Sequence, residues 1–307
     1  FDEALIYVEK WQKMLRKVYG ENDPHMLACY FLYGQICSDL GKYTDALDKF
    51  EKVEKVTQEN KNAKFNDSGE VFIYKTRCHF NLGNFKEAKE NFEKALEYNT
   101  HKSGVNSKKL ADCYYTAADI FKTSEQFKDE TKDLYSKSLE MYRNNGQACI
   151  FETMSTLTSF ATFLQRTGEE KEAVKLAEES LEICKQHFPT NLEKLESCQN
   201  VLGMAQFMAG DIENALVNLH SAAKICEDLG DSSKNLISHY FNLVRAYAKT
   251  EQYENTEKYG KKVLEMDFAK NGKVGEWIEP TLKYLAPAFS SLKKDEEFQK
   301  LKTTYTS

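Results

Sequence analysis

Histidine and cysteine are the residues that most often serve as nucleophiles, general bases or metal ligands, and here they are scattered along the sequence. The six histidines stand at positions 25, 79, 101, 187, 220 and 239. None of the eight cysteines forms the C-x-x-C spacing typical of zinc and thiol redox sites. The chain also lacks the G-x-S-x-G, H-E-x-x-H, P-loop and glycine-rich dinucleotide motifs. The sequence therefore predicts no enzyme activity, no catalytic residue, no metal site and no cofactor.

Composition excludes further classes of function. The 307 residues include 42 Lys or Arg and 48 Asp or Glu, a formal charge of −6. This balance disfavours nucleic acid as a partner, because phosphate binding needs a basic surface. No apolar run approaches the roughly 18 residues of a membrane-spanning helix, so no membrane insertion is predicted. Hydrophobic residues make up 41% of the chain, which is enough for a packed core.

A repeated segment of about 42 residues indicates which elements position the side chains. Its clearest copy is Gly41-Lys-Tyr43-x-x-Ala46-x-x-x-Phe50-x-x-Val53. Weaker or equal copies begin at anchor positions 83, 125, 168, 210 and 251, and the copy at 125 needs one extra residue. Apolar residues recur at spacings of three and four on both sides of each anchor. Each unit is therefore predicted to be a helix, a tight turn at the anchor, and a second helix.

The same period organises the whole chain. Residues 1–20 fit the second helix of a repeat whose first helix is absent, because Val8 and Trp11 fall in the slots of Phe50 and Val53. Six repeats follow over residues 21–270, and residues 271–307 form a degenerate helix pair that caps the array. N-cap residues are expected near Asp23, at 66–68, near Ser107, near Asn191 and at 231–233. We expect one continuous domain over residues 1–307.

The cysteines also follow the period. Cys29, Cys113 and Cys198 lie 12 residues before an anchor, and Cys184 and Cys226 lie 16 residues after one. Equivalent slots of different repeats are too far apart for a disulfide. We therefore expect buried packing residues in an intracellular, reducing compartment. His79 lies four residues before its anchor, in the slot that Cys37 holds in the preceding repeat, and we expect it to pack between helices.

This pattern resembles the tetratricopeptide repeat family. The ladder of small and large residues at Gly34, Tyr43, Ala46, Phe50 and Val53 follows the family pattern, and the repeat length is similar to that of kinesin-light-chain repeats. HEAT repeats are a minor alternative, since their helices lack this ladder. The resemblance implies an all-α fold, a right-handed α-solenoid (superhelix) of helix-turn-helix repeats. It also implies that the first helix of each pair lines a concave groove that binds a protein partner.

In this family the residues ten, nine and six positions before the anchor tend to face the groove. Transferred to this sequence, these positions give the candidate partner-binding residues Phe31, Leu32, Gln35, Ile73, Tyr74, Arg77, Tyr115, Asp119, Asn200, Met204, Asn242 and Arg245. The same positions include Thr116, Thr158, Ser159, Thr162, Val201 and Phe241. Apolar residues dominate the early repeats, hydroxyls the middle, and Asn and Arg the end, which suits an extended peptide or an amphipathic helix. The ordered Lys and Asn set that binds chaperone C-termini is absent.

Two functions remain open on sequence grounds. The first is an adaptor that binds a linear peptide motif or a partner segment in the groove, of which a peptide-sensing regulator is a variant. The second is a scaffold subunit of a large assembly, such as a ciliary or mitochondrial complex, held by its outer helices. We expect a cytoplasmic, ciliary or cytoskeletal location, with the mitochondrion as a second candidate.

Overall fold

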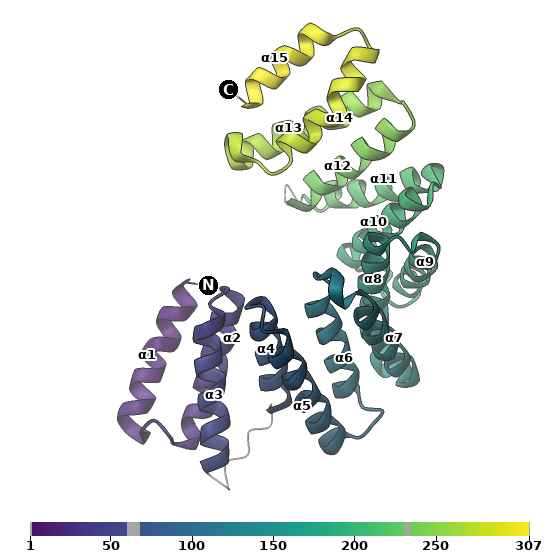
Figure 1. Cartoon of the computed structure of the whole chain (residues 1–307). Coiled ribbons are helices and arrows are strands. Elements are labelled where there is room, and N and C mark those ends of the chain that lie inside the picture. Colours follow the sequence, from purple (N-terminus) through teal and green to yellow (C-terminus); the bar gives the residue numbers. More distant parts are fainter. Residues whose placement is uncertain (1, 60–67, 231–233, 307) are drawn as a thin grey trace. The chain divides into compact units, whose positions relative to one another are not determined.

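The structure is a computed structural model that describes residues 2–59, 68–230 and 234–306, and every regular element in these ranges is helical (Figure 1). A first helix, α1, spans Asp2–Tyr19. The helices that follow form seven pairs: α2 (Leu27–Asp39) and α3 (Tyr43–Glu59), α4 (Ser68–Asn81) and α5 (Phe85–Ser103), α6 (Lys108–Phe121) and α7 (Lys128–Asn144), α8 (Ile150–Thr167) and α9 (Glu170–His187), α10 (Leu192–Ala209) and α11 (Ile212–Asp228), α12 (Lys234–Lys249) and α13 (Tyr253–Asn271), α14 (Ile278–Ser291) and α15 (Asp295–Thr306). Short 3-10 turns lie at Pro24–Met26, Glu125–Phe127, Gly146–Cys149 and Gly272–Val274.

The chain divides into two compact units, Phe1–Ile150 and Phe151–Ser307. Within each unit a helix contacts the helices that precede and follow it. First helices of successive pairs also contact one another, α2 with α4 and α4 with α6 in one unit, α10 with α12 and α12 with α14 in the other. In each unit the first helices therefore form a continuous face. The prediction that residues 1–307 make one domain stays a prediction.

The predicted turns lie at the anchors. Gly41, Gly83, Gly168 and Gly210 have positive φ between 73° and 86°, the left-handed conformation in which glycine ends a helix without strain. Glu251 takes the same conformation at φ 57°. The third pair differs, because the 3-10 turn Glu125–Phe127 separates α6 from α7 and accounts for the extra residue. Helix pairs with turns at the anchors are thus confirmed.

A second set of turns ends the second helices. Gly20, Gly104, Gly146, Gly230 and Gly272 have positive φ and stand 42 or 84 residues apart. Glycine is favoured there because a side chain would clash in this backbone conformation. These glycines recur as regularly as the anchors. They could not be recognised from the apolar residues that define the 42-residue period.

The core is built where small residues let paired helices approach. A Cβ placed on Gly34 of α2 would stand 2.5 Å from Phe50 Cε1, and one on Gly203 of α10 would stand 2.8 Å from Leu219 Cγ. Gly34 and Gly203 therefore each face the large residue of the second helix in their own pair. All eight cysteines are buried free thiols, as the packing role predicts.

Three of the expected N-cap sites lie in the described ranges and bind the first backbone N–H groups. Asp23 accepts a hydrogen bond from His25 N at 2.9 Å, and Ser107 accepts one from Leu110 N at 3.2 Å. Asn191 accepts a hydrogen bond from Lys194 N at 3.0 Å. The other two expected caps are 66–68, of which only Ser68, the first residue of α4, is described, and 231–233, which lies outside the described residues. None of the helices in the described ranges combines the length and the apolarity needed to span a bilayer.

Candidate functional site

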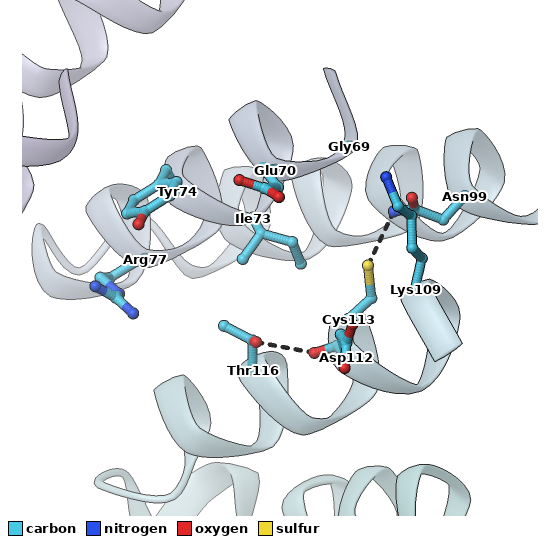
Figure 2. Close-up of a pocket in the computed structure, with 10 residues that line it drawn as sticks. All are labelled: Gly69, Glu70, Ile73, Tyr74, Arg77, Asn99, Lys109, Asp112, Cys113 and Thr116. Carbon is cyan, nitrogen blue, oxygen red and sulfur yellow. Dashed lines mark hydrogen bonds between the residues drawn. The ribbon is translucent and has the colours of Figure 1, made fainter. Parts of the chain in front are cut away.

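In the first unit an open cleft of about 310 Å³ lies between α4 and α6 (Figure 2). Three residues expected to face a partner, Ile73, Tyr74 and Arg77, line its α4 side. Across the cleft, α6 contributes Lys109, Asp112, Cys113 and Thr116, and the remaining lining residues are Gly69, Glu70 and Asn99. The cleft thus offers an apolar wall, cationic and anionic side chains, and a hydroxyl within one hollow.

Polar contacts fix the floor of this cleft. Asn99 of α5 donates to the backbone carbonyl of Ala95 and to Cys113 Sγ, both at 2.9 Å. Burial raises the pKa of Cys113 to about 12, and the neighbouring charge of Asp112 adds to the rise. The thiol is therefore protonated at neutral pH, whereas a reactive cysteine needs a lowered pKa. Thr116 donates to the Asp112 carbonyl at 2.8 Å, which fixes its hydroxyl at the cleft wall.

Aromatic contacts extend this surface towards α2. The ring of Tyr74 lies 5.8 Å from that of Phe31 in an edge-on arrangement and 5.6 Å from that of Phe50. The Arg77 guanidinium stacks 5.4 Å from the Tyr74 ring centroid, and Arg77 Nη1 lies 3.5 Å from a carboxylate oxygen of Asp39. The structure thus brings the predicted residues Phe31, Tyr74 and Arg77 together, with Phe31 partly packed against the core.

Other predicted residues of this unit lie outside the cleft lining. Leu32 is exposed and Gln35 is half-buried on α2. Tyr115 packs its ring 6.1 Å from that of Tyr135 on α7. Asp119 forms an ion pair with Lys122 in the next turn of the chain.

In the second unit, the predicted residues Asn200 and Asn242 hydrogen-bond to each other. Asn242 Nδ2 donates to Asn200 Oδ1 at 3.0 Å, and the buried His239 ring places Nδ1 3.2 Å from the same oxygen. His239 Nε2 forms a close pair with Glu196 Oε1. The network ties α10 to α12.

A hollow of about 560 Å³ adjoins this network. It is lined by Asn200 and by Glu193, Glu196, Ser197, Cys226, Leu229, Asn235, Ser238 and His239. The other predicted residues of this unit pack between helices, Met204 against the core and Arg245 with its guanidinium 5.1 Å from the Phe207 ring centroid.

Five residues that line these hollows were not predicted from the sequence. Glu70, Asp112, Ser155, Ser197 and Ser238 all lie 13 positions before an anchor. They line the two hollows above and a third, of about 320 Å³, between α8 and α10. The residue 13 positions before an anchor lies one helical turn before the residue nine positions before it, so both project from the same side of the helix. Extending the expected groove-facing positions by one helical turn towards the N-terminus would have identified these residues from the sequence.

Within the part of the chain that the structure describes, no three His, Cys, Asp or Glu side chains are grouped as metal ligands. Half-buried His79 has its pKa lowered by burial and by the nearby charge of Lys75, as suits a histidine packed between helices.

Models of the tetratricopeptide repeat match residues 77–101 and 153–191. The chain is a tetratricopeptide-repeat protein. No curated protein matches the chain in sequence.

Solved structures agree with this fold. A putative kinesin light chain of Podosopora anserina with nearly identical TPR-like repeats is 16% identical, with 66% of this chain and 96% of that chain covered and a TM-score of 0.56. The apo quorum sensor NprR of B. thuringiensis is 16% identical, with 97% and 81% covered and a TM-score of 0.61. A Rap protein complexed with competence and sporulation factor is 14% identical, with 99% and 97% covered and a TM-score of 0.56. The prediction of an all-α tetratricopeptide-repeat fold is confirmed.

Proposed function

We propose that this chain is a non-enzymatic protein-interaction module that binds an extended peptide, or an extended segment of a partner protein, along the first helices of its pairs. The observation that carries the proposal is the cleft between α4 and α6. Residues from two successive repeats, Tyr74 and Arg77 on one side and Thr116 on the other, line one open hollow. Mixed apolar and polar linings of this kind suit peptide side chains, which need an anchor and oriented hydrogen bonds.

The second unit adds groups that suit a peptide backbone. Asn200 and Asn242 stand 42 residues apart, one on each of two adjacent first helices. A side-chain amide carries both a donor and an acceptor, as a peptide group does. Asn242 spends its amide on Asn200, whereas Asn200 on α10 and Ser238 on α12 both line the hollow and favour a ligand that runs from one pair to the next.

The structural relatives supply a further, weaker argument. One relative is a quorum sensor, and another was solved in complex with competence and sporulation factor. These are properties of the relatives. Because one fold can serve many functions, the likeness is only consistent with peptide binding. The residues named in the proposal come from the cleft. The buried, free state of all eight cysteines supports our proposal of a reducing compartment.

Selection from a displayed library of random 12-residue peptides tests the proposal. Enriched peptides are synthesised with a fluorophore, and their dissociation constants are measured by fluorescence anisotropy. We expect Arg77→Glu to weaken binding about tenfold or more, because a side chain at the centre of an interface contributes disproportionately. The matched control is Lys86→Glu on α5, which makes the same charge change at an exposed position outside the cleft.

The opposite result would favour a scaffold subunit. If Arg77→Glu leaves peptide binding unchanged, and partners crosslink only to the second helices, the groove is not the binding surface.

A further inference from the structure

Three hollows of the second unit lie at equivalent places in successive repeats. The α8 hollow, of about 320 Å³, lies between α8 and α10 and is lined, among others, by Phe151, Met154 and Lys194. The α10 hollow, of about 560 Å³, lies between α10 and α12 and is lined, among others, by Glu193, Glu196 and Ser238. The α12 hollow, of about 270 Å³, lies between α12 and the residues that lead into α14 and is lined, among others, by Ile237, Val274 and Trp277.

The repeat relates the walls of the three hollows residue by residue. Equivalent lining residues are Met154, Glu196 and Ile237 on one wall, and Lys194, Asn235 and Trp277 on the other. Within each set, successive residues stand 41 or 42 positions apart, which is the repeat period. The hollows are therefore the same place in three repeats, and their side chains are what distinguishes them.

The α8 hollow presents an apolar surface together with a cation. Phe151 and Met154 line it, and Phe151 is 43% exposed. Lys194 places its Nζ 4.4 Å from the Phe151 ring centroid. This lysine would repel a second cation, whereas an apolar side chain would be buried against the ring. The α8 hollow therefore favours an apolar side chain.

The α10 hollow carries the opposite charge. Two carboxylates line it, those of Glu193 and Glu196, which stand one helical turn apart on α10. The close pair with buried His239 holds the Glu196 carboxylate at the wall, and Glu193 is exposed. The hydroxyls of Ser197 and Ser238 add further oxygen acceptors. A Lys or Arg side chain suits this lining, because its N–H groups need acceptors and its charge pairs with carboxylates.

The α12 hollow is again apolar on one side. Ile237, Val274 and Trp277 line it, and Val274 is 89% exposed. The remaining lining residues are polar and exposed: Lys270, Asn271 and Glu276. A bound apolar side chain would remove Val274 from water, which is favourable in proportion to the area covered. The α12 hollow therefore favours an apolar side chain.

The interval between the hollows fits one extended chain. α10 contacts α12 and α12 contacts α14, and packed helices lie about 8–10 Å apart. A chain in the polyproline II conformation has three residues per turn and advances about 3.1 Å per residue, so it returns to the same side after about 9.3 Å. The α8 and α10 hollows also share Glu193 and Ser197 as lining residues, so they adjoin. Side chains three residues apart in a bound segment would thus enter neighbouring hollows.

We propose that the second unit selects an extended segment in which a Lys or Arg side chain is flanked, three residues to each side, by apolar side chains. The basic side chain enters the α10 hollow, and the apolar side chains enter the α8 and α12 hollows. The pattern is the same in both chain directions, so it does not depend on which way the segment runs. This inference rests on the proposed function, because it takes the first helices as the peptide-binding face and adds the sequence that they select.

Two displayed peptide pools test this proposal on the full chain. Each peptide has 13 residues, with arginine at the central position in one pool and glutamate in the other, and all other positions are random. The pools are mixed in equal amounts, selected on the immobilised chain and counted by sequencing. We expect the arginine pool to be enriched about tenfold or more over the glutamate pool, because a like charge facing Glu193 and Glu196 is costly. Apolar residues should be enriched three positions before and three positions after the arginine.

Three variants make the test specific. Glu193→Lys reverses an exposed charge of the α10 hollow and should lower the ratio of arginine to glutamate peptides about fivefold or more. The matched control is Glu213→Lys on α11, which makes the same charge change at an exposed position outside the three hollows and should leave the ratio unchanged. Phe151→Ser should weaken the apolar preference on one flank only, and the flank that is affected gives the direction of the bound segment.

Three results would overturn the proposal, and they separate it from the proposed function. Equal enrichment of both pools would mean that the chain binds peptides, as the proposed function requires, but that the α10 hollow selects no charge. An arginine preference that persists in Glu193→Lys would mean the same, since a formal charge of −6 attracts basic peptides to the surface as a whole. If neither pool is enriched, the proposed function fails as well.

Discussion

Glu257 on α13 is a largely buried carboxylate held by two lysines. Lys261 Nζ and Lys294 Nζ each lie 2.7 Å from one of its oxygens. Burial by itself would raise the pKa of Glu257, but the hydrogen bonds and charges of the two lysines outweigh it, so the pKa lies below the ordinary 4.5. Because Lys294 stands in the turn before α15, this carboxylate joins the last two helix pairs.

The lowered pKa gives the sign of a pH dependence. The charged form is favoured in the folded state, so its contribution is complete above the ordinary pKa and is lost as pH falls through the folded value. We expect Glu257→Gln to lower the free energy of unfolding by about 1–3 kcal/mol at pH 7, as for a hydrogen bond to a charged group. The difference from the parent should shrink below pH 4. Urea denaturation at several pH values measures both.

A neighbouring carboxylate provides the control. Glu297 also pairs with Lys261, at 2.8 Å, but its side chain is half exposed. Glu297→Gln should therefore cost no more than about 1 kcal/mol. An equal loss for Glu257→Gln at pH 7 and pH 3 would show that the residue contributes through packing and not through charge.

At the scale of the helix, the turns that end each first helix differ in their backbone cost. Glu251 and Lys293 stand 42 residues apart, and both have φ 57°, where other repeats use glycine. A residue with a Cβ is strained by about 1–2 kcal/mol in this conformation. Lys293 also shows that the period continues into the predicted C-terminal pair, which forms as α14 and α15.

Replacing these two residues should stabilise the protein. We expect Glu251→Gly and Lys293→Gly each to raise the free energy of unfolding by about 0.5–1 kcal/mol, with the gain reduced by the greater freedom of glycine in the unfolded chain. Gly83→Lys is the reverse test. A Cβ at Gly83 meets nothing within 4 Å, so its expected loss of about 1–2 kcal/mol is purely conformational. Thermal and urea denaturation would contradict this account if both exchanges were neutral.

The helix pairs could be predicted because their packing repeats. Ala46 and Phe50 recur in equivalent forms along the chain, and each copy must bury the same face against its partner. The candidate site was harder to predict, because neighbouring slots on one helix face divide between core and surface. Phe31 packs against Phe50 and Tyr74, whereas Arg77 reaches the cleft. Whether a given position is exposed in the cleft depends on the side chains that the next helix pair packs against it. The residue pattern of a single helix carries no information about those side chains.

At the scale of the whole chain, the contacts within each unit join helices that are neighbours or next neighbours along the sequence. In such arrays stability is close to a sum of repeat terms and neighbour terms. A local defect should therefore be felt over about two repeats. Gly34 offers a sharp defect, because a methyl group there would stand 2.5 Å from the Phe50 ring.

We expect Gly34→Ala to lower the free energy of unfolding by about 1–3 kcal/mol, because overpacking forces side chains and backbone to shift. In hydrogen exchange, amides of α2, α3 and α4 should lose protection while those of α12 to α15 keep theirs. Adding Phe50→Leu to Gly34→Ala makes room for the methyl group and should restore part of the protection, so the two changes combine less than additively. A uniform loss of protection from α1 to α15 would contradict the neighbour description, because it would mean that the array opens as one cooperative unit.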